Sequence, residues 1–167
     1  MDISLNLAGV VKESIVDGPG FRYVVFAQGC PHHCEGCHNP ETHDFGTGFD
    51  TTPLKIIEDI ERNSLISGIT LSGGEPFCQP VAFAVLAKMA AEKGISVITY
   101  TGYLFEELIK SGKEDVLALL KATDILVDGP FLIEQKTLLI KFRGSKNQRI
   151  IDVKKSLEAN TVITTDF

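Results

Sequence analysis

The sequence predicts an α/β protein built as an open, incomplete parallel (β/α) barrel. Strand-like and helix-like segments alternate along the chain, and loops rich in glycine or cysteine follow the strands. This alternation is typical of right-handed βαβ units of about 30 residues each. The chain has 167 residues, whereas a closed eight-stranded barrel typically takes about 250. We therefore expect about four or five units in a single domain over residues 1–167.

The expected elements begin with a buried strand at 21–28, where aromatic and β-branched residues suit a parallel sheet. A long irregular loop is expected over 29–52, and loops of this length are usually functional. A helix over 53–63 follows, with Thr52 as N-cap and Pro53 in the first turn. The remaining elements are strands at 67–72, 95–100 and 124–128, and helices at 80–93, 105–110 and 114–121.

Composition and charge limit the possible partners. The net charge is −6 and the pI is near 5.2, which argues against a protein that reads a nucleic-acid backbone. No apolar run is long enough to span a membrane, and the first residues lack a signal-peptide pattern. We expect a cytoplasmic protein that binds neither nucleic acid nor membrane and keeps its thiols reduced.

Three of the four cysteines, Cys30, Cys34 and Cys37, lie at the spacing C-x3-C-x2-C in the loop after the first strand. In a reducing compartment this grouping indicates metal ligands rather than disulfides. Three thiolates can hold three irons of a four-iron cluster and leave the fourth iron open to a reactive ligand, whereas an electron-transfer cluster normally has a fourth cysteine. The alternative is zinc, with a fourth ligand from Cys78, His32, His33, His38 or His43.

The fourth cysteine and a glycine-rich segment complete the set of candidates. Cys78 is expected to be a buried structural thiol. Gly73, Gly74 and Glu75 follow the second predicted strand. Adjacent glycines let a ligand approach the backbone closely, and a glutamate can receive an ammonium group. Taken alone, the segment also fits a tight turn. The carboxyl ends of parallel strands meet at one rim, so we expect it to lie near the cysteine loop.

With these two motifs the chain resembles the radical S-adenosylmethionine superfamily, whose members are open barrels of this kind. The resemblance implies that Cys30, Cys34 and Cys37 hold a [4Fe-4S] cluster. The open iron then chelates the amino and carboxylate groups of S-adenosylmethionine, and one electron splits it into methionine and a 5′-deoxyadenosyl radical. It further implies that Gly36, Cys37 and His38 flank this cofactor, and that Gly73, Gly74 and Glu75 contact its methionine end.

Further segments narrow the resemblance. The stretch from Asp17 to Arg22 matches the D-G-x-G-x-R pattern of glycyl-radical-enzyme activases, although alone it fits a turn before a strand. The segments 126–131 and 142–149 resemble the activating proteins of anaerobic ribonucleoside-triphosphate reductases; the second also fits a polar surface turn. The similarity extends over about residues 10–155.

The narrower resemblance implies an enzyme that abstracts a hydrogen from a specific glycine of the reductase. Asp17 and Arg22 would contact the partner's glycine loop, and a flavodoxin or ferredoxin would supply the electron. Gly36 departs from the pattern, because many radical enzymes have an aromatic residue before the third cysteine. The alternatives are an activase of pyruvate formate-lyase, an enzyme of the deazapurine pathway, and a non-enzymatic zinc or iron–sulfur module.

Overall fold

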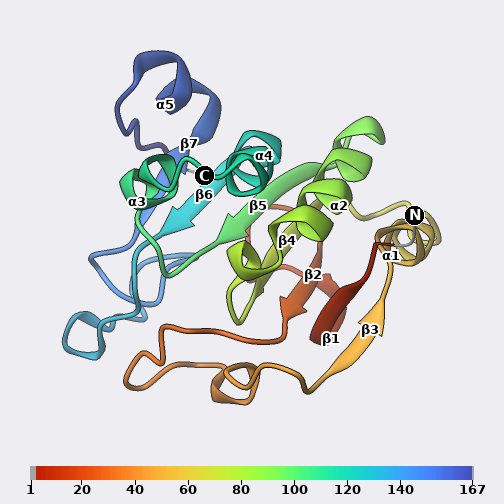
Figure 1. Ribbon diagram of the computed structural model, residues 1–167, viewed down its shortest axis with the longest axis horizontal. Coiled ribbons are helices and arrows are strands. Elements are labelled where there is room, and N and C mark those ends of the chain that lie inside the picture. Colours follow the sequence, from red (N-terminus) through yellow and green to blue (C-terminus); the bar gives the residue numbers. More distant parts are fainter. Residues whose placement is uncertain (1–2, 167) are drawn as a thin grey trace.

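A seven-stranded sheet forms the centre of the molecule in the computed structural model, which describes residues 3–166 (Figure 1). Four strands in its centre are parallel: β2 (Arg22–Ala27), β4 (Gly68–Gly73), β5 (Ser96–Tyr100) and β6 (Ile125–Asp128). Three outer strands are antiparallel to their neighbours: β1 (Leu5–Ser14), β3 (Phe49–Thr51) and β7 (Arg149–Asp152). The order β3-β1-β2-β4-β5-β6-β7 has two ends, which confirms the expected open α/β sheet.

The outer strands are the part of the sheet that the sequence patterns do not predict. β1 alternates buried and half-buried residues at its start, as a strand covered on one face does. β3 has three residues and lies within the stretch expected to be irregular, where it pairs with β1. β7 pairs with β6 after a long connection. The sheet is therefore mixed and not wholly parallel, because long-range pairing adds strands at both edges.

The helices agree closely with expectation: α1 (Pro53–Glu61), α2 (Pro80–Glu92), α3 (Phe105–Lys110) and α4 (Glu114–Ala122). Thr52 caps α1 by accepting the Lys55 N–H at 3.3 Å. Gly94 ends α2 with a φ of +75°, a conformation that favours glycine. A fifth helix, α5 (Val153–Ala159), follows β7 and is not among the predicted elements.

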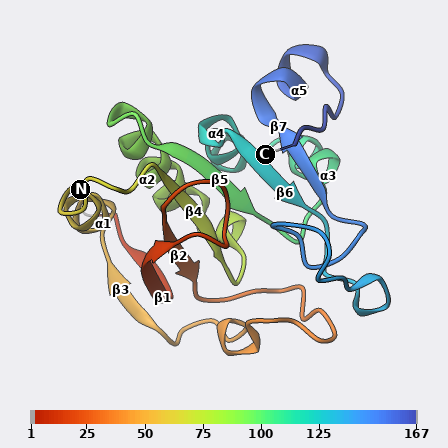
Figure 2. The ribbon, with the colours of Figure 1, turned by 180° about the vertical axis from the view of Figure 1, so that it is seen from behind.

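The two faces of the sheet have different roles. Helices α1, α2 and α4 cover one face, and Figure 2 shows the molecule from the opposite side. Successive side chains of a strand point to opposite faces. Leu71 of β4 therefore packs in the helix-covered core, whereas the neighbouring Thr70 accepts a hydrogen bond from Arg22 on the other face.

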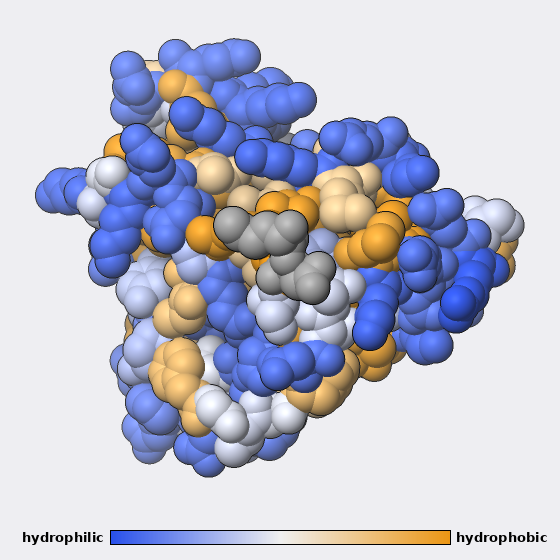
Figure 3. All heavy atoms as spheres, turned by 45° about the vertical axis from the view of Figure 1, so that its right-hand side comes forward, coloured by the Kyte–Doolittle hydropathy of each residue, from blue (hydrophilic) through white to orange (hydrophobic). Residues whose placement is uncertain are grey.

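The outer surface is mostly hydrophilic in the view of Figure 3, with hydrophobic residues in small groups between hydrophilic ones. Within residues 3–166, no helix combines the length and the apolar character needed to cross a membrane.

Candidate active site at the carboxyl ends of the parallel strands

A cavity of about 440 Å³ lies where the parallel strands end. Its walls come from the cysteine loop after β2, the glycine segment after β4, the end of β5 and the segment between β6 and β7. Val16 and Asp17, which precede β2, also line it. The chemically suggestive segments of the sequence thus meet at one rim, as the parallel order predicts.

All three clustered cysteines line this cavity. Cys30 is buried directly after β2, and its backbone N–H donates to the His43 carbonyl at 3.1 Å. Burial raises the pKa of the Cys30 thiol to about 11, so a metal must displace its proton to bind. Cys34 and Cys37 lie farther along the loop, where the Cys37 N–H donates to the Cys34 carbonyl at 3.1 Å.

The cavity suits an iron–sulfur cluster. Its donor set is three free thiols, and soft thiolates are the usual ligands of such clusters. Among residues 3–166, no three His, Cys, Asp or Glu side chains converge to hold a single metal ion. A cluster binds each thiol through a different iron, so its ligands do not need to converge on one point. Cys78 is exposed, so the prediction that it is buried is wrong.

The paired glycines bring the ends of β2 and β4 together. A Cβ at Gly73 would lie 2.4 Å from the Ala27 nitrogen, and one at Gly74 would lie 2.3 Å from the Gly29 oxygen. Their close approach lets the Gly74 N–H donate to the Ala27 carbonyl at 2.8 Å. The Glu75 N–H likewise donates to the Gly29 carbonyl at 2.8 Å. The glycines thus fix the backbone just before Cys30, and both also line the cavity.

Glu75 differs from its expected role. Its side chain is fully buried and accepts hydrogen bonds from the Thr101 hydroxyl at 2.9 Å and the Gly102 N–H at 2.8 Å. The Phe77 N–H donates to the other carboxylate oxygen, and His32 Nε2 lies 2.6 Å from the first. An ammonium group of a ligand does not fit among these partners. Glu75 instead connects the end of β5 to the His32 ring, which lines the cavity.

Arg22 also differs from its expected role, because it is 1% exposed. Its guanidinium donates to the Thr70 hydroxyl and the Ile69 carbonyl, both at 2.8 Å, and to Ser96. Burial lowers its pKa to about 10. A direct contact with a partner protein is incompatible with this position. Thr70 in turn donates to the Asp17 carbonyl at 2.8 Å, so Arg22 holds the turn that carries Asp17.

The remaining predicted site residues divide into two groups. Asp17 lines the cavity and accepts a hydrogen bond from the Ser14 hydroxyl at 2.6 Å. His38 lines it as well, with its ring 5.0 Å from that of Phe131. Gly36 is not a lining residue, and a Cβ there would lie 2.6 Å from the side chain of Ile133. Phe131 lines the cavity from the other wall, so an aromatic ring is present although position 36 has none.

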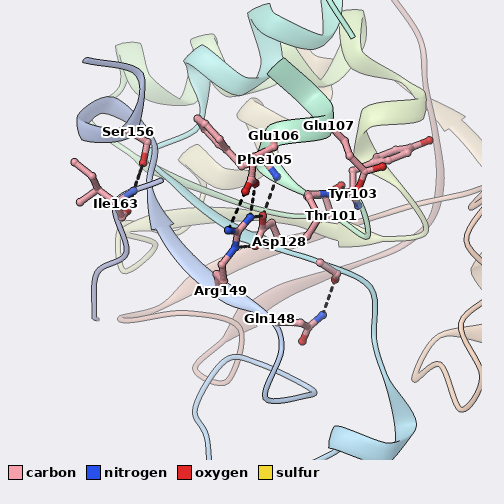
Figure 4. Close-up of polar contacts among 12 residues, drawn as sticks. Thr101, Tyr103, Phe105, Glu106, Glu107, Asp128, Gln148, Arg149, Ser156 and Ile163 are labelled. Carbon is pink, nitrogen blue, oxygen red and sulfur yellow. Dashed lines mark hydrogen bonds and ion pairs between the residues drawn. The ribbon is translucent and has the colours of Figure 1, made fainter. Parts of the chain in front are cut away.

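The segment 142–149, to which the sequence patterns assign no chemical role, forms the opposite wall of the cavity. Arg143, Gly144 and Gln148 line the cavity, so the segment is more than a polar surface turn. Arg149 lies between the buried Asp128 and Glu106, and these carboxylates raise its pKa (Figure 4). The signal in the sequence is the resemblance of residues 142–149 to the activating proteins; the contacts of this segment appear only in three dimensions.

Most of the chain matches a known protein family. Residues 16–151 match the family model described as a 4Fe-4S single cluster domain. The pyruvate formate-lyase-activating enzyme of Clostridium pasteurianum is 37% identical over 63% of this chain and 48% of its own length. The solved structure of QueE from Escherichia coli is a distant match, with a TM-score of 0.48 and 15% identity over 59% of this chain and 53% of its own.

A closer similarity identifies the family. The anaerobic ribonucleoside-triphosphate reductase-activating protein of Vibrio cholerae is 37% identical over 81% of this chain and 90% of its own length. The chain belongs to the family of anaerobic ribonucleoside-triphosphate reductase-activating proteins and carries its 4Fe-4S single cluster domain. The resemblance to radical S-adenosylmethionine activases is thereby confirmed.

Proposed function

We propose that this protein uses S-adenosylmethionine to generate a glycyl radical on an anaerobic ribonucleoside-triphosphate reductase. When bound, a [4Fe-4S] cluster with one open iron supplies the electron and the chelation that split S-adenosylmethionine into methionine and a 5′-deoxyadenosyl radical. The observation that carries the proposal is one cavity lined by three cysteines, by Gly73 and Gly74, and by Phe142, Arg143, Gly144 and Gln148 from the opposite wall. It has room for a ligand beside the thiols.

The residues of the cavity have separate tasks in this proposal. Cys30, Cys34 and Cys37 hold the cluster. Gly73 and Gly74 offer their backbone to the methionine end of the cofactor, while His38 and Phe131 flank the adenosyl end. Glu75 acts indirectly, because its hydrogen bonds hold His32 and the end of β5 against the cavity.

A protein substrate suits the exposed rim. Val16 is 73% exposed although it lines the cavity, so a partner segment can cover it and exclude water. Asp17, beside it, is our candidate for contact with the reductase's glycine loop. Glycine is a suitable target because its radical is shared between the flanking amide nitrogen and carbonyl. A flavodoxin or ferredoxin would supply the electron, in a reducing cytoplasm.

The proposal is tested by anaerobic reconstitution with iron and sulfide, followed by reduction in the presence of S-adenosylmethionine. We expect equal release of 5′-deoxyadenosine and methionine. A protein that holds its full complement of iron yet releases neither product would contradict the proposal. Metal analysis distinguishes this proposal from a non-enzymatic zinc-binding module. Zinc in place of iron after native purification would support the zinc module.

The similarity to the C. pasteurianum enzyme makes pyruvate formate-lyase a second candidate partner. The reconstituted protein should be offered each partner in turn and the glycyl radical measured by electron paramagnetic resonance. A signal on pyruvate formate-lyase alone would favour the second candidate.

A further inference from the structure

The Arg143 side chain has hydrogen-bonding capacity that the protein does not use. It lines the cavity, and its Nη1 donates to the Gln148 carbonyl at 3.0 Å. Its Nε is buried and has no hydrogen-bond partner among the described residues. Arg149, in the same segment, forms ion pairs with Glu106 and Asp128, whereas no ion pair to Arg143 is found within residues 3–166. A buried unpaired donor is costly, so this side chain is suited to an acceptor that arrives with a ligand.

The backbone on which Arg143 is mounted is held in place before any ligand binds. The Gly144 and Ser145 N–H groups both donate to Gln148 Oε1, at 2.8 and 3.2 Å. Gln148 Nε2 donates to the Gly129 carbonyl at 3.1 Å, and Asn147 donates to the Pro130 carbonyl at 2.7 Å. These bonds tie the segment to the end of β6. The arginine therefore belongs to a preorganised wall, and its direction is not left to a mobile loop.

The charge of the cavity points to the ligand group. Among the described residues that line it, Arg143 carries the one permanent positive charge. S-adenosylmethionine has a cationic sulfonium, an amino group, neutral ribose and adenine groups, and a single anionic group, its carboxylate. A planar guanidinium pairs strongly with a carboxylate, and a carboxylate has lone pairs enough to bind iron and arginine together.

We propose that Arg143 binds the carboxylate of S-adenosylmethionine. This inference rests on the proposed function and assigns a task to a residue for which the sequence offered none. Arg143 selects ligands that carry the carboxylate, and the bonds of Gln148 hold the guanidinium where it can do so.

The test pairs a protein variant with a ligand variant. Arg143→Gln and wild type, both reconstituted anaerobically, are titrated by equilibrium dialysis with S-adenosylmethionine and with its decarboxylated analogue. We expect the substitution to weaken binding of S-adenosylmethionine about 10- to 100-fold and binding of the analogue less than about 3-fold, because the analogue lacks the group that Arg143 holds. Lys146→Gln is the matched control, since Lys146 is an exposed cation in the same segment. It should change neither affinity.

Equal weakening for both ligands, or no weakening for either, would overturn the inference. So would unchanged affinity for S-adenosylmethionine combined with weaker binding of the reductase, because Arg143 would then serve the partner. Iron content shows that each variant is loaded, and Arg143→Lys should recover part of the discrimination because it restores the charge. If wild type itself fails to bind S-adenosylmethionine, the proposed function fails, and that result is distinct from a failure confined to Arg143.

Discussion

The two walls of the cavity are built in different ways. The cysteine loop is anchored at its start by Gly29 and Cys30, but Pro31, Glu35 and Gly36 are exposed. The opposite wall, residues 142–149, is tied to β6 through the side chains of Asn147, Gln148 and Arg149. In the first wall Glu75 holds His32, but residues 33–36 are largely exposed. In the second wall hydrogen bonds and ion pairs fix the segment. A bound cluster should therefore stabilise the first wall and leave the second almost unchanged.

The largest expected effect comes from removing a cysteine of the first wall. Cys34→Ala should lose the cluster and all cleavage of S-adenosylmethionine, because no thiol replaces the missing ligand in the cavity. Cys78→Ala is the control and should keep full iron and sulfide content, since Cys78 is exposed and does not line the cavity. Equal loss in both variants would indicate a four-cysteine site.

In the second wall, Arg149→Met should lower the free energy of unfolding by about 2–4 kcal/mol, because it leaves the buried Asp128 carboxylate without its cation. Denaturant titration of the apoprotein measures this change. Arg62→Met is the control, since the Arg62 side chain is 77% exposed and lies 3.7 Å from Asp59. A loss from Arg149→Met no larger than that from Arg62→Met would contradict the description of this wall as fixed by its ion pairs.

Gln148→Ala should have a smaller effect, about 1–3 kcal/mol, since it removes the acceptor for two backbone N–H groups and the donor to the Gly129 carbonyl. It should also weaken S-adenosylmethionine binding, because Gln148 holds the segment that carries Arg143. Calorimetric unfolding and equilibrium dialysis measure the two changes. A loss of stability without any change in the affinity for S-adenosylmethionine would show that binding does not require this wall to be rigid.

The smallest expected effect is the change in hydrogen exchange when the cluster is loaded, measured for both walls in one sample. Loading the cluster should slow hydrogen exchange of the backbone amides in residues 31–38 by about tenfold or more, while residues 143–149 change little. Mass spectrometry of apo and loaded protein resolves both segments. Similar slowing in the two segments would mean that the difference between the walls is absent in solution.

The parallel strands and the cysteine loop could be predicted from sequence because their signals are local. Buried apolar runs, Thr52 as a cap and Gly94 as a stop depend on neighbouring residues. β7 could not be predicted, because its pairing with β6 depends on how the long segment between them folds. The sheet was therefore expected to be parallel throughout, and its antiparallel edges come from long-range contacts.

The site residues also divide into those that local sequence identifies and those whose roles depend on long-range contacts. Residue type and spacing were enough to select Cys30, Cys34 and Cys37, since ligand chemistry belongs to the side chain itself. The roles of Glu75 and Arg22 depend on where the fold places their charged groups. The Glu75 carboxylate accepts a hydrogen bond from Thr101, which follows β5, and the Arg22 side chain is buried against β4. A motif identifies such residues but does not show which way they face.

In the proposed function, a hydrogen atom passes from a glycine of the reductase to the adenosyl group bound in this cavity. It is tested most directly with reductase whose glycines are deuterated at the α-carbon, mixed anaerobically with the reduced, cluster-loaded protein and S-adenosylmethionine. We predict a glycyl radical on the reductase and deuterium in the methyl group of 5′-deoxyadenosine, both absent with Cys34→Ala. Release of 5′-deoxyadenosine without deuterium, and with no radical on the reductase, would contradict it.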